Sequence, residues 1–508
     1  TLATNEDKVR HCLSQPSVAT QLDQYLTVTS AAKHKKYWEK AKEFRVDGND
    51  LFRGKRFQEA IDAYNQAIVL ASTPDSSHTA EANSELSLGF ANRSAVFYHL
   101  RQYDNCLSDI CDAFKYEYPL NATKLLLRKV NCLVQKGCFG DAVDVVRSQQ
   151  FVDQSLDKQS ETQMKALMDT IESKGAKNRS NCINNTIPKT DLKFVANELM
   201  PNASQSLQLC VSSTKGRHIV AKDDINISDV LFMERPYASV LLPQYYRSHC
   251  HHCYGKLVDT PVMPCHQCTQ VMYCNDECRS EGWQECHQYE CGFLDVLHDI
   301  GIAHLAFRTV LVCGVGNAIQ VAKQSSTSQL SATTPYLNTY ESVYALVDHS
   351  NDFPIEDSVS YSLVASLLVR LTQKLSLVPK EPQSVDILGG IVLKHILQLI
   401  TNGHSIASME NVENSSDLCF EDKRIATAIY PTVSLMNHSC DPNVIAIYDK
   451  KLLIVRAARG IPKGHQVVNC YGPHCKRMST KDRRTALMDQ YFFACDCSPC
   501  VSGAEDKS

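Results

Sequence analysis

The stretch CHHCYGKLVDTPVMPCHQCTQVMYCNDECRSEGWQECHQYEC, from Cys250 to Cys291, decides how the chain is organised. Its spacing is C-x2-C-x11-C-x2-C-x5-C-x3-C-x8-H-x3-C, which places eight zinc-competent side chains within 42 residues. Two tetrahedral Zn(II) ions need eight ligands, and metal binding can fold a module too small for its own apolar core. The spacing therefore predicts a structural two-zinc module with no open position for catalytic water. The eight candidate ligands are Cys250, Cys253, Cys265, Cys268, Cys274, Cys278, His287 and Cys291, and the adjacent Cys286, His249, His251, His252 and His266 remain alternatives.

The composition excludes several classes of protein. The 508 residues are 44% hydrophobic and 21% charged, as in ordinary globular proteins, and their number predicts several domains. A formal net charge of -4 provides no global attraction to DNA or to anionic membranes. We therefore expect no sequence-specific nucleic-acid partner. The most apolar stretches are short and interrupted by charged residues, so we also expect no transmembrane helix. The cysteine spacing favours metal thiolates over disulfides, which predicts a reducing compartment, the cytoplasm or nucleus.

Residues 31–154 have the pattern of paired helices with a repeat near 34 residues. A shared small residue falls at Ala60, Cys106 and Ala142, where paired helices must approach closely. This pattern resembles a tetratricopeptide (TPR) array. Residues 155–205 are polar and predict a linker.

The metal module interrupts a region of short strands. Alternating apolar and polar residues with turn signals predict strands in 206–249, and similar patterns return within 399–474. Helical periodicity dominates the intervening 292–398. We therefore expect one mostly β domain that is split by insertions.

Four motifs resemble, in order, those of the SET domain of protein-lysine methyltransferases. They are TKGRHIVA (Thr214–Ala221), YPTVSLMNHSCDPN (Tyr430–Asn443), NCYGPH (Asn469–His474) and YFFACDCSPC (Tyr491–Cys500). The metal module resembles a MYND zinc finger, so the chain from about residue 31 to residue 500 resembles the SET and MYND domain-containing proteins. The resemblance implies a multidomain α+β fold. Its parts are an all-α TPR array (31–154), a linker (155–205), the N-terminal part of the SET domain (206–249), the MYND finger (250–291), a helical insertion (292–398), the SET catalytic core (399–474) and a zinc-bound post-SET tail (475–501).

The resemblance also implies an activity, the transfer of a methyl group from S-adenosyl-L-methionine to lysine side chains of histone or nonhistone proteins. Tyr471 matches the tyrosine whose hydroxyl orients the lysine amine and the methyl group. Phe493 would pack on the adenine ring, with Tyr491 beside the lysine channel. The expected cofactor-binding residues are Lys215, Gly216, Arg217, His349, Asn402, Asn437, His438, Tyr491 and Phe493.

Zinc sites follow from the same resemblance. In the MYND family the ligands interleave, which implies one ion on Cys250, Cys253, Cys274 and Cys278 and another on Cys265, Cys268, His287 and Cys291. In the tail, Cys495, Cys497 and Cys500 supply three thiolates, one fewer than a closed site needs. Cys440 is the expected fourth ligand, and this gives three Zn(II) ions in total.

The helical repeats carry a candidate peptide site. Some TPR domains hold the C-terminal Glu-Glu-Val-Asp of heat-shock chaperones with a basic residue and Asn four apart, a second Asn, and Lys-x3-Arg. Residues four apart share a helix face, so cationic and amide groups can converge on the terminal carboxylates. The matching residues are Arg45, Asn49, Asn92, Lys124 and Arg128.

A second functional class stays open at this stage. The chain can be read as a catalytically weak adaptor that recruits chaperones through the TPRs, and proline-rich peptides or transcriptional corepressors through the MYND finger. The presence of Asn437, His438 and Tyr471 favours catalysis, because a decayed site has no chemical reason to contain all three.

Overall fold

The computed structural model describes residues 4–28, 34–73, 79–118, 122–148, 158–175, 194–257, 261–325, 335–381, 383–411 and 420–502. Two compact units are present. The helical unit comprises Ala31–Thr190 and Tyr246–Gly282, and the SET unit comprises Thr1–Ser30, Asp191–Tyr245 and Trp283–Ser508. The predicted finger is thus divided at Gly282 between the two units.

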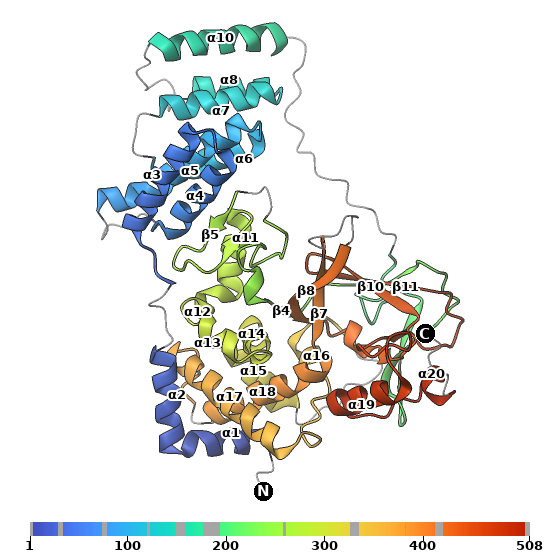
Figure 1. The fold of residues 1–508 in the computed structure, drawn as a ribbon. Helices are drawn as coiled ribbons and strands as arrows, with labels where there is room; N and C mark the ends of the chain where they lie inside the picture. Colours follow the sequence, from blue (N-terminus) through green and yellow to red (C-terminus); the bar gives the residue numbers. More distant parts are fainter. Residues whose placement is uncertain are drawn as a thin grey trace. The chain divides into compact units, whose positions relative to one another are not determined.

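Antiparallel helix pairs build the helical unit, as the repeat pattern predicts (Figure 1). The pairs are α3 (Trp38–Arg53) with α4 (Phe57–Leu70), α5 (Ala80–His99) with α6 (Tyr103–Lys115), and α7 (Thr123–Gln135) with α8 (Phe139–Arg147). The shared small residues Ala60, Cys106 and Ala142 are fully buried. Gly48 allows the closest approach, because a Cβ there would lie 2.6 Å from the Tyr64 ring.

A further helix, α10 (Lys158–Gly175), occupies part of the expected linker, so the linker assignment of 155–205 is wrong for these residues. Met164, Leu167 and Ile171 of α10 are buried in one core with α7 and α8. Their spacing of three and four residues places them on one helix face. The segment is polar on average, so its composition did not indicate the narrow apolar face of this helix.

Part of the predicted finger packs against the helical pairs within the same unit. It contains β5 (Met263–Pro264), β6 (Met272–Tyr273) and α11 (Asp276–Gly282), with β5 and β6 antiparallel. The buried Arg279 donates a hydrogen bond from Nη2 to the Tyr116 hydroxyl at 2.6 Å, and Lys115 pairs with Asp276. The finger segment is therefore tied to α6 by polar contacts.

Small sheets, all antiparallel except one, form the β part of the SET unit, which confirms the predicted split β domain. One sheet has the order β10-β11-β3, another β4-β8-β7, a third pairs β1 with β2, and β9 pairs in parallel with β12. The bounds are β1 Leu207–Ser212, β2 Gly216–Ala221, β3 Val230–Glu234, β4 Ala238–Leu241, β7 His404–Asn411, β8 Phe420–Ile429, β9 Asn437–His438, β10 Val444–Asp449, β11 Leu452–Ala457 and β12 Val468–Asn469.

The predicted helical insertion lies between β4 and β7 in the sequence. Its helices are α13 (Leu294–Asp299), α14 (Ala303–Cys313), α15 (Val315–Ser325), α16 (Tyr340–Tyr344), α17 (Ile355–Lys374) and α18 (Ser384–Asn402). The end of the predicted finger forms η3 (Trp283–His287) and α12 (Gln288–Glu290). Short elements η2 (Pro243–Tyr245) and η4 (Val433–Leu435) flank strands, and α19 (Thr480–Tyr491) and α20 (Ser498–Val501) form the tail.

Among the described helices, α18 alone is long and apolar enough to span a membrane by itself. The consecutive helices α14 and α15 reach that length and apolar composition only together, and they are bent by 91° relative to each other. The most apolar window of α18 is 67% buried within the protein. Packing inside the SET unit therefore accounts for its apolar character.

The N-terminal segment forms two helices that the sequence pattern did not predict, α1 (Asn5–Ser14) and α2 (Pro16–Val28). Thr4 and Asp7 form a capping box that begins α1. α1 lies against α18, where a Cβ on Gly389 would come within 2.7 Å of Val9. These first helices therefore belong to the SET unit, in agreement with their blue ribbon beside α17 and α18 in Figure 1.

Candidate methyl-transfer site

The motifs TKGRHIVA (Thr214–Ala221) and YPTVSLMNHSCDPN (Tyr430–Asn443) are joined through one side chain. Asn437 of β9 donates a hydrogen bond from Nδ2 to the backbone carbonyl of Lys215 at 3.1 Å. Gly216, the next residue, has φ +60°, a left-handed conformation that glycine adopts without strain. The predicted cofactor residues Lys215, Gly216 and Asn437 are therefore brought to one place from segments 222 residues apart.

His438 joins this segment to the predicted catalytic tyrosine. β9 and β12 run in parallel with His438 opposite Asn469, and the His438 Nδ1 accepts the backbone N–H of Tyr471 at 3.0 Å. Burial lowers the pKa of His438 to about 4, so the imidazole is neutral at neutral pH and can accept this bond. The histidine therefore orients the Tyr471 backbone.

Tyr471 is held at its hydroxyl and at its backbone carbonyl. Its hydroxyl donates to the Met436 carbonyl at 2.7 Å, and the Tyr491 hydroxyl donates to the Tyr471 carbonyl at 3.0 Å. The two tyrosine rings lie 4.9 Å apart between centroids. Burial raises the pKa of Tyr471 above its usual range, so its hydroxyl stays protonated. Such a group orients a reactant and does not remove its proton.

The ring of Phe493, also in the tail, lies near that of His438, with 6.0 Å between the two ring centroids. Phe493 and the two tyrosines pack against the buried cluster of tail cysteines. This arrangement provides apolar and aromatic surface beside the polar groups of Lys215 and Asn437, as a zwitterionic cofactor with an adenine ring requires.

The loop that carries His349 is held from two sides. Arg217 donates from Nη2 to the Ala345 carbonyl at 2.7 Å, and Asn402 donates from Nδ2 to the Val347 carbonyl at 3.0 Å. Arg217 and Asn402, both predicted to contact the cofactor, thus support the backbone just before His349. His349 itself bonds Asp352 at 2.9 Å.

Phe492 was missed by the sequence analysis. It ends α19 in the left-handed region at φ +60°, and its ring lies 5.2 Å from that of His349, which has φ +51°. Strained backbone of this kind persists where the surrounding contacts hold it. The ring of Phe353 completes the contact at 4.8 Å from Phe492. The aromatic run at 491–493 was the available signal.

The four tail cysteines converge as predicted. Their Sγ atoms all lie within 4.8 Å of one another, and Cys440 is 3.9 Å from Cys495 and 3.6 Å from Cys500. Tetrahedral zinc with Zn–S bonds of about 2.3 Å places its sulfur atoms about 3.8 Å apart. The set Cys440, Cys495, Cys497 and Cys500 therefore fits a zinc ion.

The helical unit contains a second such set, formed by Cys250, Cys253, Cys274 and Cys278. Here Cys274 lies 3.8 Å from Cys253 and 3.5 Å from Cys278, again the spacing of zinc thiolates. None of the flanking histidines belongs to this set. The other predicted finger ligands lie in different units, Cys265 and Cys268 in the helical unit and His287 and Cys291 in the SET unit, so their site stays a prediction.

The predicted peptide-clamp residues lie on the first helix of each pair. Asn92 donates from Nδ2 to Asn49 Oδ1 at 2.9 Å, so the two asparagines are adjacent. Lys124 and Arg128 line a cavity of about 730 Å³ together with residues of α10. Arg45 differs from its expected role, because its guanidinium forms a bidentate ion pair with Glu85 at 2.7 and 3.0 Å.

The family model of the SET domain matches residues 77–472, more than half of the sequence. The chain belongs to the SET-domain family. It is 27% identical to human protein-lysine N-methyltransferase SMYD4 over 91% of this chain and 67% of that protein. It is 30% identical to mouse N-lysine methyltransferase SMYD2 over 60% of this chain and 63% of that protein.

The predicted resemblance to SET and MYND domain-containing proteins is thereby confirmed. The chain spans about two thirds of the length of these relatives. The crystal structure of the SET domain of LSMT bound to lysine and AdoHcy aligns with a TM-score of 0.25 and 12% identity, over 59% of this chain and 54% of that one. This likeness is too low to bear on the fold.

A buried carboxylate beside the segment that leads to Asn437 was also missed by the sequence analysis. Glu234, at the end of β3, is fully buried and accepts the backbone N–H groups of Thr432 and Val433, each at 2.9 Å. It therefore holds η4, which leads directly to Asn437. Burial raises the pKa of Glu234 to about 7.

Glu234→Gln is expected to flatten the dependence of stability on pH. Because the folded-state pKa of about 7 lies above the ordinary 4.5, the folded protein holds this proton more tightly, and stability falls as the pH rises from 4.5 to 7. The difference amounts to roughly 3 kcal/mol for this carboxyl. Urea unfolding of both proteins at pH 5 and 7.5 measures it. Parallel pH dependences of the two free energies of unfolding would contradict the assignment.

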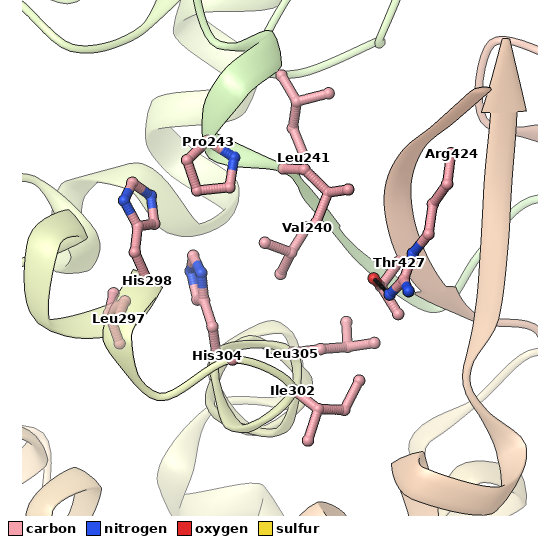
Figure 2. A pocket seen from close by; sticks show the side chains of 12 residues that line it. Val240, Leu241, Pro243, Leu297, His298, Ile302, His304, Leu305, Arg424 and Thr427 are labelled. Atoms are coloured by element: carbon pink, nitrogen blue, oxygen red, sulfur yellow. Dashed lines mark hydrogen bonds between the residues drawn. The ribbon is translucent and has the colours of Figure 1, made fainter.

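A small cavity in the SET unit lies apart from these motifs. It has a volume of about 160 Å³ and lies between β4, α13, α14 and β8 (Figure 2). Val240, Ile302 and Leu305 give it a largely apolar wall, and burial lowers the pKa of the adjacent His298 to about 4. The described residues that line it include none of the predicted methyl-transfer residues, so it is a packing cavity of the scaffold.

Proposed function

We propose that the chain is a protein-lysine N-methyltransferase that uses S-adenosyl-L-methionine. The observation that carries the proposal is the single constellation in which Asn437 binds the Lys215 backbone, His438 binds the Tyr471 backbone, and the Tyr471 hydroxyl is held by Met436. Membership of the SET-domain family and the names of its relatives support the same activity.

The cofactor supplies a methyl group activated by a positively charged sulfur. The chain's own residues bind it by charge and shape. The Lys215 and Arg217 segment and Asn437 offer cationic and amide groups to its methionine end, and Phe493 offers an aromatic face to its adenine. His349 lies on the loop that Arg217 and Asn402 support.

Lysine must be neutral to accept a methyl group. At pH 7.4 a free lysine with a pKa near 10.4 is only about 0.1% neutral, which costs roughly 4 kcal/mol. The aromatic walls formed by Tyr471 and Tyr491 lower this cost, because an apolar channel disfavours the charged ammonium. The protonated Tyr471 hydroxyl then orients the amine, and alignment of the nucleophile supplies much of the acceleration.

Calorimetric titration with S-adenosyl-L-methionine, followed by tritium transfer from the labelled cofactor into cell-lysate proteins, tests the proposal on the full, zinc-loaded chain. Binding together with labelled protein bands is the expected result. Folded protein that binds no cofactor and labels nothing would overturn the proposal and favour the adaptor function.

A second function, binding of an acidic C-terminal peptide, is favoured by the adjacency of Asn49 and Asn92 and by the cavity that Lys124 and Arg128 line. The described residues around this cavity include two cations and no carboxylate, so its charge suits terminal carboxylates. The heat-shock chaperone tail Glu-Glu-Val-Asp has that chemistry. Arg45 takes no part in this proposal, because Glu85 already neutralises it.

Lys124→Ala is expected to weaken binding of a Glu-Glu-Val-Asp peptide about tenfold, the loss of one charge-assisted hydrogen bond. Lys124 is exposed, so its removal leaves the array folded. Fluorescence anisotropy measures the affinity, and Lys129→Ala on the same helix is the matched control. Equal affinity for a peptide with an amidated C-terminus would contradict a carboxylate site.

The remaining partners belong to the same proposal. The MYND finger is a candidate site for proline-rich peptides. The chain is proposed to act in the cytoplasm and nucleus, where its many thiols stay reduced.

Three zinc ions, two in the finger and one in the tail, form the proposed set of metals. Zinc analysis of the purified chain tests that number.

A further inference from the structure

Arg483 of α19 is a cation in an unusual place, because its side chain has no exposed surface. Its guanidinium donates to the Met478 carbonyl at 2.6 Å and to the Thr480 hydroxyl at 3.1 Å. Its third contact runs from Nη2 to the Sγ of Cys500 at 3.5 Å. The Nε of Arg483 is buried and has no acceptor within the described part of the chain.

A buried guanidinium needs a compensating negative charge, because an isolated charge is strongly disfavoured in a protein interior. In the described ranges no ion pair joins Arg483 to a carboxylate. Its partners at Met478 and Thr480 are uncharged. The adjacent group able to carry negative charge is the cluster of four tail cysteines, which Arg483 reaches at Cys500.

The charge of that cluster follows from its chemistry. Four thiolates around one Zn²⁺ carry a net charge of -2, and this charge is buried together with Cys440, Cys495 and Cys500. One guanidinium reduces the net charge of the buried group to -1. An N–H···S hydrogen bond adds to the stabilisation, since groups behind the ligands tune both the affinity and the orientation of a metal site.

We propose that Arg483 is a positioning residue of the tail zinc site, where it compensates the charge of the thiolates and fixes Cys500. The site joins Cys440, two residues beyond His438, to the tail that follows Tyr491 and Phe493. Arg483 thereby acts on the methyl-transfer site through the metal. Only this last consequence rests on the proposed function, because charge compensation at the metal stands without it.

The neighbouring Arg484 provides a matched comparison. It is exposed, and it donates to the backbone carbonyls of Cys495 at 3.3 Å and Cys500 at 3.0 Å. It therefore contacts the same tail but meets carbonyl groups instead of sulfur. Loss of Arg484 removes an exposed cation and its carbonyl contacts, while the buried guanidinium of Arg483 stays beside the thiolates.

The test uses the full zinc-loaded chain and its Arg483→Met, Arg483→Lys, Arg484→Met and Cys500→Ser variants. Competition with a chelating dye gives the affinity of each zinc, and the ion missing from Cys500→Ser identifies the tail site. Arg483→Met is expected to weaken that site about 10–100-fold, the usual effect of removing a group that supports a metal ligand. Arg483→Lys should recover most of the affinity, and Arg484→Met should stay near the unmodified chain.

A spectroscopic readout covers the case in which Arg483→Met fails to fold. In cobalt-loaded protein, the sulfur-to-metal charge-transfer band of the tail site is the difference between the parent spectrum and that of Cys500→Ser. We expect this band to move to lower energy in Arg483→Lys, because lysine lacks the fixed N–H···S bond. An unchanged band in Arg483→Lys, or unchanged zinc affinity in folded Arg483→Met, would overturn the proposal. Neither readout requires methyl transfer, so failure of the proposed activity is recognised separately.

Discussion

Tyr471→Phe is expected to lower the rate of methyl transfer about 100- to 1000-fold while cofactor binding stays within about threefold. The substitution removes one hydroxyl, which the protein holds against the Met436 carbonyl and keeps protonated by burial. Loss of one preorganised hydrogen-bonding group at a reacting centre has this order of effect. Single-turnover transfer from tritiated cofactor gives the rate, and calorimetry gives the affinity.

Tyr430→Phe is the matched control for this substitution. The Tyr430 hydroxyl also donates to a backbone carbonyl, that of Lys451 at 2.8 Å, so its loss costs a similar amount of stability. The chain should therefore retain its activity when Tyr430 is changed. Equal rates for Tyr471→Phe and the unmodified chain would show that the hydroxyl does not act on the reactants, and equal losses in both variants would assign the effect to stability.

Cys495→Ser is expected to remove the tail zinc and to weaken cofactor binding at least tenfold. Cys495 is buried in the core that Cys440, Cys500 and Leu487 form, and Tyr491 and Phe493 pack against this core. A structural zinc site contributes about 10–16 kcal/mol of binding free energy, so its loss should release the tail from the segment Asn437–Cys440. Zinc content and cofactor affinity, measured on the same sample, check both parts of the expectation.

Cys475→Ser is the control, because Cys475 packs on the same core but is not among the four clustered thiols. It should leave the zinc content and the cofactor affinity unchanged. A Cys495→Ser protein that lost its tail zinc but bound the cofactor normally would separate the metal from the methyl-transfer site. In that case the position of Phe493 in the cofactor site would not depend on the zinc.

Short-range patterns carried most of the correct expectations. The cysteine spacing identified the candidate thiols, because metal ligands from one loop or turn recur at short, fixed intervals. Their grouping into the two four-cysteine sets of the structure, with Cys440 from a distant segment, followed from the family resemblance. The helix pairs and their small buried residues Ala60, Cys106 and Ala142 followed from periodicity. The four motifs located the segments that meet at Tyr471, through their resemblance to the SET domain.

The contacts that hold these segments could not be predicted. Glu234 binds backbone groups about 200 residues away, and Arg45 pairs with Glu85 from a neighbouring helix pair. A charged residue shows its type in the sequence but not its partner, since partners come from segments that folding alone brings together. The apolar stripe of α10 was diluted by its polar neighbours, and its role depends on the core formed by α7 and α8.

By itself, the sequence determined the candidate chemistry of this protein, namely the thiols able to bind zinc, the helical repeats and the segments that carry the methyl-transfer motifs. The tertiary structure alone decided which charges are neutralised and which remain available. Arg45 is paired with Glu85, while Arg483 is buried against the tail thiols. The physical reason is that burial and pairing set the energy of a charge, and both depend on residues distant in the sequence.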